Sequence, residues 1–203
     1  MVDFGFEIRE QLIKAGITKL DAAILTHDHA DHVQGIDNLR VFPFMKQKPL
    51  PIITDRATAS AIENRYKYLF HEKCLKTQII QYEDNITIGD LKLQLFRQHH
   101  GPIDSLGIKI EDFVYSNDVS SFPAISEKFL YDLKYWVLDC RAYVSNNHHL
   151  GLEKVLELNE KYKPQQLLLT NLGHEIDYEE ITKLLPKNIK PLYDGYKIRM
   201  NSY

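Results

Sequence analysis

The sequence has 203 residues, with 25 lysines and arginines against 28 aspartates and glutamates, for a formal charge of −3. This length suits one domain with a proper core, and a composition of 44% hydrophobic and 26% charged residues excludes a wholly disordered chain. The near-neutral charge argues against a protein that holds nucleic acid by bulk charge, and two cysteines are too few for a disulfide scaffold. No apolar run approaches the roughly 18 residues of a membrane span, and the amino end carries no signal segment. We therefore expect a soluble, cytoplasmic protein.

Short apolar strands and helices are expected to alternate along the first half of the chain. Residues 1–20 predict an amphipathic helix that ends at Ala15-Gly16 and has Ile8, Leu12 and Ile13 on one face. A short apolar strand over 21–26 follows and runs directly into the polar segment 27–32. The next expected elements are a short helix over 33–39, an irregular crossing over 41–51, a strand over 51–54, a helix over 56–68, and strands over 77–82 and 86–95.

The second half is expected to begin with strands and then to alternate strands with helices. The expected elements are a strand over 96–101, a hairpin of strands over 106–110 and 113–115, a strand within 132–139, a helix over 150–162, a strand over 166–170, a helix over 178–185, and a closing strand pair over 189–199. Asp194-Gly195 is the turn signal of that last pair. The pattern predicts an α/β layered fold that forms a single domain over residues 1–203.

A cluster of histidines and aspartates directly after the strand over 21–26 is the most informative feature. It reads His27-x-His29-x-Asp31-His32, and imidazole and carboxylate are ligands of zinc, manganese and iron. Alternate side chains His27 and His29 can aim at one point, whereas Asp31 and His32 aim at a neighbouring point. Four ligands in six residues suit two adjacent metal ions better than one. The alternative is a solvated polar loop, which three crowded imidazoles disfavour because they repel one another when protonated.

This motif after an apolar strand resembles the signature of the metallo-β-lactamase superfamily. The resemblance runs from about residue 2 to residue 199 and implies an αββα sandwich. It also implies three later ligands: His100 before Gly101, a bridging Asp118 after the strand over 113–115, and His174 after the strand over 166–170. The implied ligand set is His27, His29 and His100 for one metal ion, Asp31, His32 and His174 for the other, and Asp118 between them.

Shorter motifs are similar to one bacterial branch of that superfamily, related to phosphodiesterases that act on cyclic ribose phosphates. They are Asp3-Phe4, Ser116-Asn117-Asp118-Val119, Leu169-Thr170-Asn171 and Tyr193-Asp194-Gly195. The resemblance implies a dinuclear metal-dependent hydrolase for a small phosphorylated substrate, with two divalent ions (zinc or manganese, with iron as a further choice) that activate water and clamp the phosphoryl oxygens.

Four residues outside the ligand set also have expected roles, and two of these residues have an alternative interpretation. The resemblance implies that His149 lies over the metals as a catalytic residue that contacts the phosphate or protonates the leaving oxygen. The alternative is a solvent-facing histidine at a helix start. His99 is expected to be a neighbour of the ligand His100. Asp3 would orient a ligand imidazole or cap a strand end, and Cys140 is expected to pack as a small apolar group.

The sequence departs from the family pattern at its amino end, because family members have one or more strands and a glycine-rich turn before the segment that matches Val2-Asp3. A shorter start site, a split or decaying gene, and a partner chain that covers the sheet are the explanations. Competing functions are a lactone, thioester or β-lactam hydrolase and a catalytically silent relic that binds metal or a partner. RNA cleavage ranks lower because the chain lacks a basic arm, and a homodimer stays open.

Overall fold

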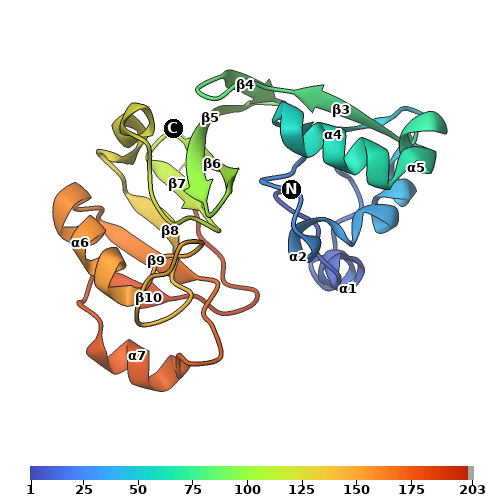
Figure 1. Ribbon diagram of the computed structural model, residues 1–203. Coiled ribbons are helices and arrows are strands. Elements are labelled where there is room, and N and C mark those ends of the chain that lie inside the picture. Colours follow the sequence, from blue (N-terminus) through green and yellow to red (C-terminus); the bar gives the residue numbers. More distant parts are fainter. Residues whose placement is uncertain (201–203) are drawn as a thin grey trace. The chain divides into compact units, whose positions relative to one another are not determined.

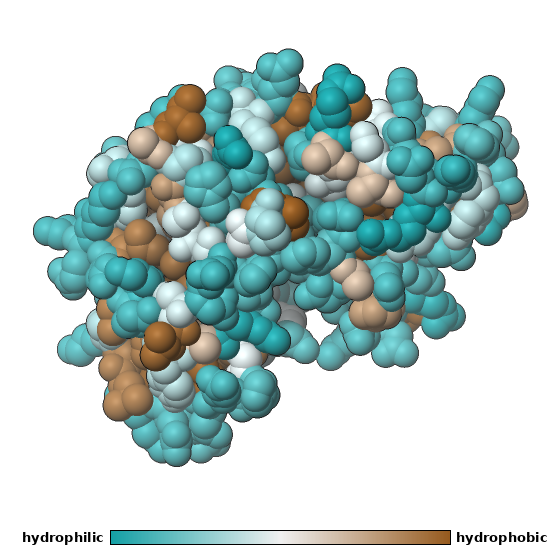
Figure 2. Space-filling view, in the orientation of Figure 1, coloured by the Kyte–Doolittle hydropathy of each residue, from teal (hydrophilic) through white to brown (hydrophobic). Residues whose placement is uncertain are grey.

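A computed structural model describes residues 1–200, in which helices and strands alternate along the chain (Figure 1). The predicted α/β class is confirmed, since these residues form two sheets and the helices α1 to α7. The backbone divides into two compact units after Arg97, and the single domain over 1–203 stays a prediction. Polar side chains cover much of the face in Figure 2, and no helix of the described chain has the length and apolar character needed to cross a bilayer.

A parallel sheet with the strand order β1-β2-β3 is the base of the first unit. Its strands are β1 (Ala23–Ile24), β2 (Leu50–Thr54) and β3 (Leu75–Ile79). β4 (Asn85–Ile88) and the start of β5 (Leu91–His100) form an antiparallel hairpin. Gly89 makes the turn at a φ of 59°, a conformation that glycine adopts without steric cost. The strands predicted over 51–54 and 77–82 therefore form with shifted bounds, and the turn at Gly89 divides the strand predicted over 86–95 in two.

Helices flank this sheet and enclose the core of the first unit. They are α1 (Ile8–Lys14), α2 (Ala30–Val33), the 3₁₀ helix η1 (Ile36–Arg40), α3 (Val41–Lys46), α4 (Arg56–Arg65) and α5 (Lys67–His71). The Asp55 side chain caps α4 by accepting hydrogen bonds from the backbone N–H groups of Ala57 and Thr58. Figure 1 shows α4 and α5 alongside β3. The core beneath the helices includes Phe4, Leu25 and Ile52, all fully buried.

Three expectations for the first unit are wrong in detail. Residues 41–46 form α3 instead of an irregular crossing, because Pro43 lies in the first helical turn, where the missing N–H has no partner to lose. The helix expected over 56–68 is interrupted at Tyr66, whose φ of −119° ends α4. Ile13 is 64% exposed, so α1 buries Ile8 and not the whole predicted face.

Five strands of the second unit pair in the order β10-β9-β8-β7-β6. Their bounds are β6 (Ile103–Ile110), β7 (Phe113–Ser116), β8 (Tyr135–Asp139), β9 (Gln166–Thr170) and β10 (Ile189–Pro191). β6 and β7 are the predicted hairpin, and the pairs from β7 to β10 are parallel. β8 and β9 are apolar and almost wholly buried, as expected for central parallel strands. Their carboxyl ends lie at the same edge of the sheet.

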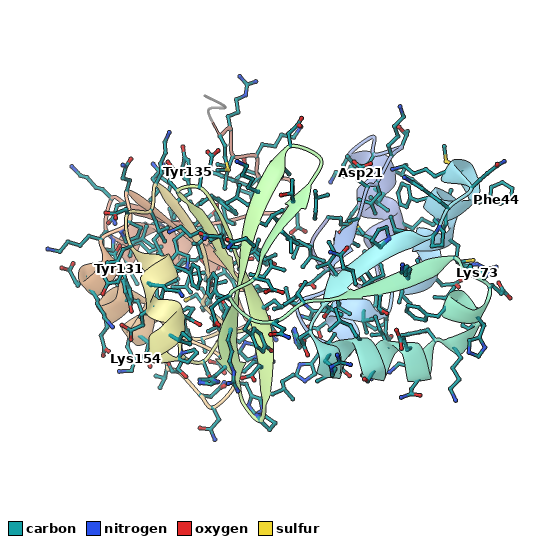
Figure 3. All side chains as sticks on the ribbon, turned by 90° about the horizontal axis from the view of Figure 1, so that it is seen from above. Asp21, Phe44, Lys73, Tyr131, Tyr135 and Lys154 are labelled. Atoms are coloured by element: carbon teal, nitrogen blue, oxygen red, sulfur yellow. The ribbon has the colours of Figure 1, made fainter. Side chains whose placement is uncertain are left out.

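Helices and one large aromatic side chain complete the second unit. The helices are the 3₁₀ helix η2 (Ala124–Leu130), α6 (Leu152–Tyr162) and α7 (Tyr178–Leu184). Trp136 of β8 is fully buried; its indole nitrogen donates to Ser116 Oγ at 3.2 Å and its ring meets the Tyr162 ring at 5.7 Å. Lys154 of α6 lies at the surface in Figure 3 and pairs with Glu157. The helix predicted over 150–162 is thus confirmed as α6, whose buried residues are Val155, Asn159 and Tyr162.

The closing strand pair expected over 189–199 is wrong. Only Ile189–Pro191 is a strand, and residues 192–200 contain no strand. The turn itself forms, since Gly195 has a φ of 88° and the Tyr196 N–H donates to the Tyr193 carbonyl at 3.0 Å. β10 pairs in parallel with β9 instead, and within residues 192–200 no strand returns along β10.

Candidate metal centre

The predicted ligand segment of the first unit begins after β1 and ends within α2. The chain leaves β1, passes His27, and enters α2 directly after His29. The His27 ring centroid is 4.5 Å from that of His29 and 4.2 Å from that of His32. His27 and His32 are buried, whereas His29 and Asp31 are exposed. The change from strand to helix thus brings the three imidazoles of the motif close together.

One carboxylate orients two of these imidazoles. Asp3 Oδ2 is 2.7 Å from His32 Nδ1 and accepts the Thr26 hydroxyl at 2.9 Å, while Asp3 Oδ1 accepts the Thr26 backbone N–H at 2.8 Å. Thr26 Oγ1 is 3.0 Å from His27 Nδ1. Because the hydroxyl proton goes to Asp3, Thr26 Oγ1 accepts from His27, and both rings carry a proton on Nδ1. Both imidazoles therefore have the tautomer that ligates a metal through Nε2.

Backbone contacts hold this network in place. The Asp3 N–H donates to the Ile24 carbonyl at 2.9 Å, and the Phe4 N–H donates to the His32 carbonyl at 2.8 Å. A side chain on Gly5 would begin 2.3 Å from the Asp31 carbonyl oxygen, so only glycine allows this close approach. Residues 3–5 thus fix the ligand segment from one side. The role of Asp3 as an orienting residue, one of its two predicted interpretations, is the one that the hydrogen bonds support.

The second unit contributes His100 and Asp118 from the ends of β5 and β7. The His100 Nδ1–H donates to the His148 carbonyl at 2.7 Å, and His100 Nε2 is 3.5 Å from Asp118 Oδ2. Both side chains are almost fully buried. Asp118 has a φ of 49°, and the Ser105 hydroxyl holds its carbonyl at 2.8 Å. His100 therefore has the same tautomer as His27 and His32, in which Nε2 is the ring nitrogen that can coordinate a metal ion.

A second carboxylate, at the end of β8, holds the predicted catalytic histidine. Asp139 Oδ2 is 2.9 Å from His149 Nδ1 and accepts the Val119 N–H at 3.2 Å. The Asn171 amide donates to Asp118 Oδ1 and to Asp139 Oδ1, both at 3.0 Å. Burial raises the pKa of the Asp139 carboxyl, and the hydrogen bond that His149 donates to Asp139 raises the pKa of His149. This network favours a protonated His149.

Potential ligand atoms of Asp118, Asp139 and His149 lie within 4.8 Å of one another. Asp139 already accepts three hydrogen bonds from protein donors, which suits an orienting group better than a ligand. The His149 ring centroid is 4.8 Å from that of His100, and the His149 side chain is only 19% exposed. His149 therefore lies beside a predicted ligand and does not face solvent freely.

Two histidines of the second unit lie apart from this group. His174 follows β9, is exposed, and is not part of the close group of Asp118, Asp139 and His149. His99 Nδ1 is 3.0 Å from Asp104 Oδ1, which agrees with its expected place as a neighbour of His100. The roles of all seven predicted ligands stay predictions.

Sequence reasoning did not predict the hydrogen bonds by which Thr26, Asp139 and Asn171 hold other side chains of the site. Asp139 is the last residue of β8, and Asn171 directly follows β9. Polar residues at the carboxyl ends of adjacent parallel strands are the signal that could have found both, because those ends meet at one edge of a sheet. Thr26 carries no such signal, since a threonine after an apolar strand is common.

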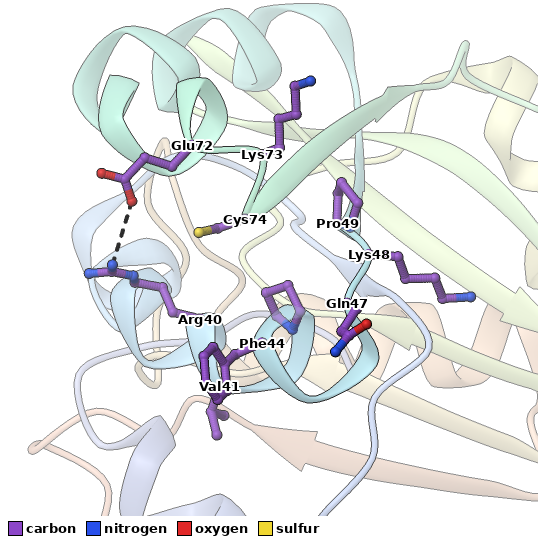
Figure 4. Close-up of a pocket in the computed structure, with 10 residues that line it drawn as sticks. Arg40, Val41, Phe44, Gln47, Lys48, Pro49, Glu72, Lys73 and Cys74 are labelled. Atoms are coloured by element: carbon purple, nitrogen blue, oxygen red, sulfur yellow. Dashed lines mark ion pairs between the residues drawn. The ribbon is translucent and has the colours of Figure 1, made fainter.

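A hollow of about 610 Å³ in the first unit contains none of the predicted site residues (Figure 4). It lies between α3 and the turn from α5 to β3, and Arg40 pairs with Glu72 across it at 3.5 Å. Phe44 on its lining is 87% exposed and lies at the surface in Figure 3. None of the residues that line this hollow is therefore among those to which the motif assigns metal binding.

Comparisons with known proteins find matches to this chain in both sequence and fold. A family described as the beta-lactamase superfamily domain matches residues 1–171. A solved diphosphatase of the PhnP family is 28% identical, with a TM-score of 0.91 over 97% of this chain and 77% of that chain. An octanoyltransferase of Porphyromonas gingivalis is 26% identical over 96% of this chain and 41% of its own length. The exodeoxyribonuclease WalJ of Streptococcus pneumoniae is 22% identical over 90% of this chain and 65% of its own length.

The chain therefore spans less than half of the first of these sequence relatives and about two thirds of the second. The family match covers most of the chain, includes the segment 27–32 and ends at Asn171. Together with the metallo-β-lactamase fold of its structural neighbours, these matches show that the chain belongs to the metallo-β-lactamase superfamily.

Proposed function

We propose that the chain is a dinuclear metal-dependent hydrolase that acts as a phosphodiesterase on a small nucleotide-like or cyclic phosphate substrate. One observation carries the proposal. His27, His32 and His100 each donate an Nδ1–H to a protein acceptor, which leaves Nε2 as the ligating nitrogen in all three. Histidines of a solvated polar loop need no such shared arrangement. The similarity to a PhnP-family diphosphatase supports the phosphorus chemistry.

The proposed ligands fall into two sets with one carboxylate between them. His27, His29 and His100 form the first set, Asp31, His32 and His174 the second, and Asp118 bridges. Neutral imidazoles and carboxylates fit zinc, manganese or iron. When bound, two such ions supply Lewis acidity toward a phosphoryl group and toward water.

His149 and its partner supply the proton in this proposal. Asp139 holds the imidazole by Nδ1 and stabilises its charged form. The opposite ring nitrogen, Nε2, then carries the proton that the leaving oxygen needs when its ester bond breaks. Asp139 cannot take over that role, because Val119, His149 and Asn171 already occupy both its oxygens.

Metal content and substrate choice test the proposal together. The purified protein should contain about two equivalents of zinc, manganese or iron, measured by elemental analysis. It should hydrolyse bis(p-nitrophenyl) phosphate faster than p-nitrophenyl octanoate, an acyl ester with the same chromophore. Faster cleavage of the octanoate would assign acyl chemistry instead. A protein that takes up no metal after reconstitution would contradict the hydrolase altogether.

A further inference from the structure

Two uncharged polar side chains, Gln98 of β5 and Ser105 of β6, are fully buried in the second unit. The Gln98 amide nitrogen donates to Ser105 Oγ at 3.2 Å and to the Asn117 carbonyl at 3.3 Å. The Ser105 hydroxyl in turn donates to the Asp118 carbonyl at 2.8 Å. The pair therefore holds two successive carbonyl groups of the main chain from which the proposed bridging ligand projects.

The direction of each of these hydrogen bonds follows from its acceptor. A main-chain carbonyl only accepts, so the Gln98 atom that faces Asn117 is the amide nitrogen, and Ser105 must give its one proton to Asp118. Ser105 Oγ then has only lone pairs left, and one of them accepts from Gln98. The two amide hydrogens and the hydroxyl hydrogen thus each have an acceptor, and neither side chain can turn without losing a bond.

Fold stability gives only part of the reason for a glutamine at this place. The side-chain oxygen of Gln98, Oε1, is buried and has no hydrogen-bond partner within residues 1–200. A buried carbonyl oxygen without a partner costs free energy, which an apolar side chain of similar size would avoid. This cost opposes what the amide nitrogen gains, so the definite result of the Gln98 side chain is the position of the backbone that it holds.

The backbone held in this way has an uncommon conformation. Asp118 has a φ of 49°, in the left-handed region that is strained for residues other than glycine. Because φ turns the Cα–Cβ bond relative to the preceding peptide, this conformation decides where the carboxylate lies. Asp118 Oδ1 accepts the Asn171 amide at 3.0 Å, and Asp118 Oδ2 is 3.5 Å from His100 Nε2. Relaxation of Asp118 to a negative φ would carry Oδ2 away from His100.

We propose that Gln98 and Ser105 are positioning residues of the candidate metal centre that act through the backbone of Asp118. Their hydrogen bonds offset the strain of the left-handed conformation and keep Asp118 Oδ2 beside His100 Nε2 before any ion binds. Ligands that are already in place bind more tightly, because less ordering is needed on binding. The inference rests on the proposed function, in which Asp118 and His100 are ligands.

Zinc affinity, measured by competition with a chromophoric chelator, tests the positioning role without relying on turnover. Ser105→Ala removes the donor to Asp118, and Gln98→Met removes the amide but keeps a side chain of similar length. Each should lower zinc affinity about 10- to 100-fold, the usual effect of losing a partner that holds a ligand in place. Ser105→Thr keeps the hydroxyl and should bind zinc nearly as tightly as the wild type.

Ser126→Ala is the matched control for a change within the core. Ser126 of η2 is also fully buried, but its hydroxyl has no hydrogen-bond partner in the described part of the chain. Its removal should leave zinc affinity unchanged. Thermal unfolding in excess chelator is measured for all four variants, because a residue that only supports the fold would lower the unfolding temperature and leave zinc affinity as it is.

The outcomes separate the positioning role from the proposed function. Zinc affinity equal to that of the wild type in Ser105→Ala and Gln98→Met would overturn the positioning role, even in a protein that hydrolyses phosphodiesters. An equal loss of affinity in Ser126→Ala would also overturn it, because any change in the core would then have the same effect. Where Ser105→Ala does not fold, Gln98→Met decides. A loss confined to Ser105→Ala and Gln98→Met, in a protein whose wild type cleaves no phosphodiester, would support the positioning role and refute the hydrolase.

Discussion

Replacing Asp3 by asparagine keeps the shape of the side chain but replaces one acceptor oxygen by a donor. Asp3 accepts three hydrogen bonds, from the Thr26 N–H, the Thr26 hydroxyl and His32 Nδ1. If the amide nitrogen takes the Oδ2 position, it meets the Nδ1–H of His32 donor to donor. His32 can escape only by moving its proton to Nε2, which removes the lone pair that would ligate a metal. If the amide nitrogen instead takes the Oδ1 position, it faces the Thr26 N–H donor to donor, and the hydrogen bond from that N–H is lost.

Asp3→Asn should weaken two properties of the protein, its metal affinity and its stability without metal. Loss of a partner that orients a ligand histidine lowers metal affinity by about 10- to 100-fold. The lost bonds to a charged acceptor destabilise the metal-free protein by about 2 kcal/mol. Competition with a chromophoric chelator measures the zinc affinity, and thermal unfolding in excess chelator measures the second effect.

Asp28→Asn is the matched control for this substitution. Asp28 belongs to the same segment, but its carboxylate pairs with Arg65 at 3.2 Å and orients no predicted ligand. Loss of the Asp28 charge in this variant should change the zinc affinity less than twofold. If Asp3→Asn lowers the unfolding temperature but binds zinc as tightly as the wild type, Asp3 supports the fold only, and the tautomer argument for His32 is refuted.

Further expected results concern the same site and one thiol. Asp118→Ala should abolish phosphodiester hydrolysis while circular dichroism stays native, and near-wild-type activity would contradict its bridging role. His149→Ala should lower kcat by about 10²- to 10⁴-fold at unchanged metal content, whereas loss of metal would make His149 a ligand. Removing metal with chelator should lower the unfolding temperature, and restoring zinc should reverse the change. Burial raises the pKa of Cys140 to about 12, so iodoacetamide at pH 8 should label the half-buried Cys74 and spare Cys140, as peptide mass analysis would show.

Local sequence predicted those elements in which residue type, hydrophobic pattern and burial all favour the same structure. The strand over 166–170 has the predicted bounds because Leu167, Leu168 and Leu169 are apolar and sit in the buried centre of a parallel sheet. The prediction of an irregular crossing failed at residues 41–46, because a proline in the first turn of a helix, as at residue 43, does not break it. It also failed beyond Pro191, where a turn signal does not reveal which strand the chain pairs with.

The candidate site shows the same division between local and non-local information. The cluster over 27–32 could be predicted because its members are neighbours in the chain. The hydrogen bonds of Asn171 could not, since they join it to Asp118 and Asp139, 53 and 32 residues away, although its place after β9 marks it as a candidate for this edge of the sheet. No periodicity or spacing encodes such a bond, because it depends on how β7, β8 and β9 align.

The single carboxylate of Asp3 serves two imidazoles, one directly and one through the Thr26 hydroxyl. In the proposed ligand sets His27 and His32 belong to different metal ions. A first ion that draws either imidazole into place would therefore order the other through the shared carboxylate, and the second ion would bind a site whose ordering is already complete. Metal loading would be cooperative, so a titration should pass from the empty protein to the doubly loaded one with little of the singly loaded form between them.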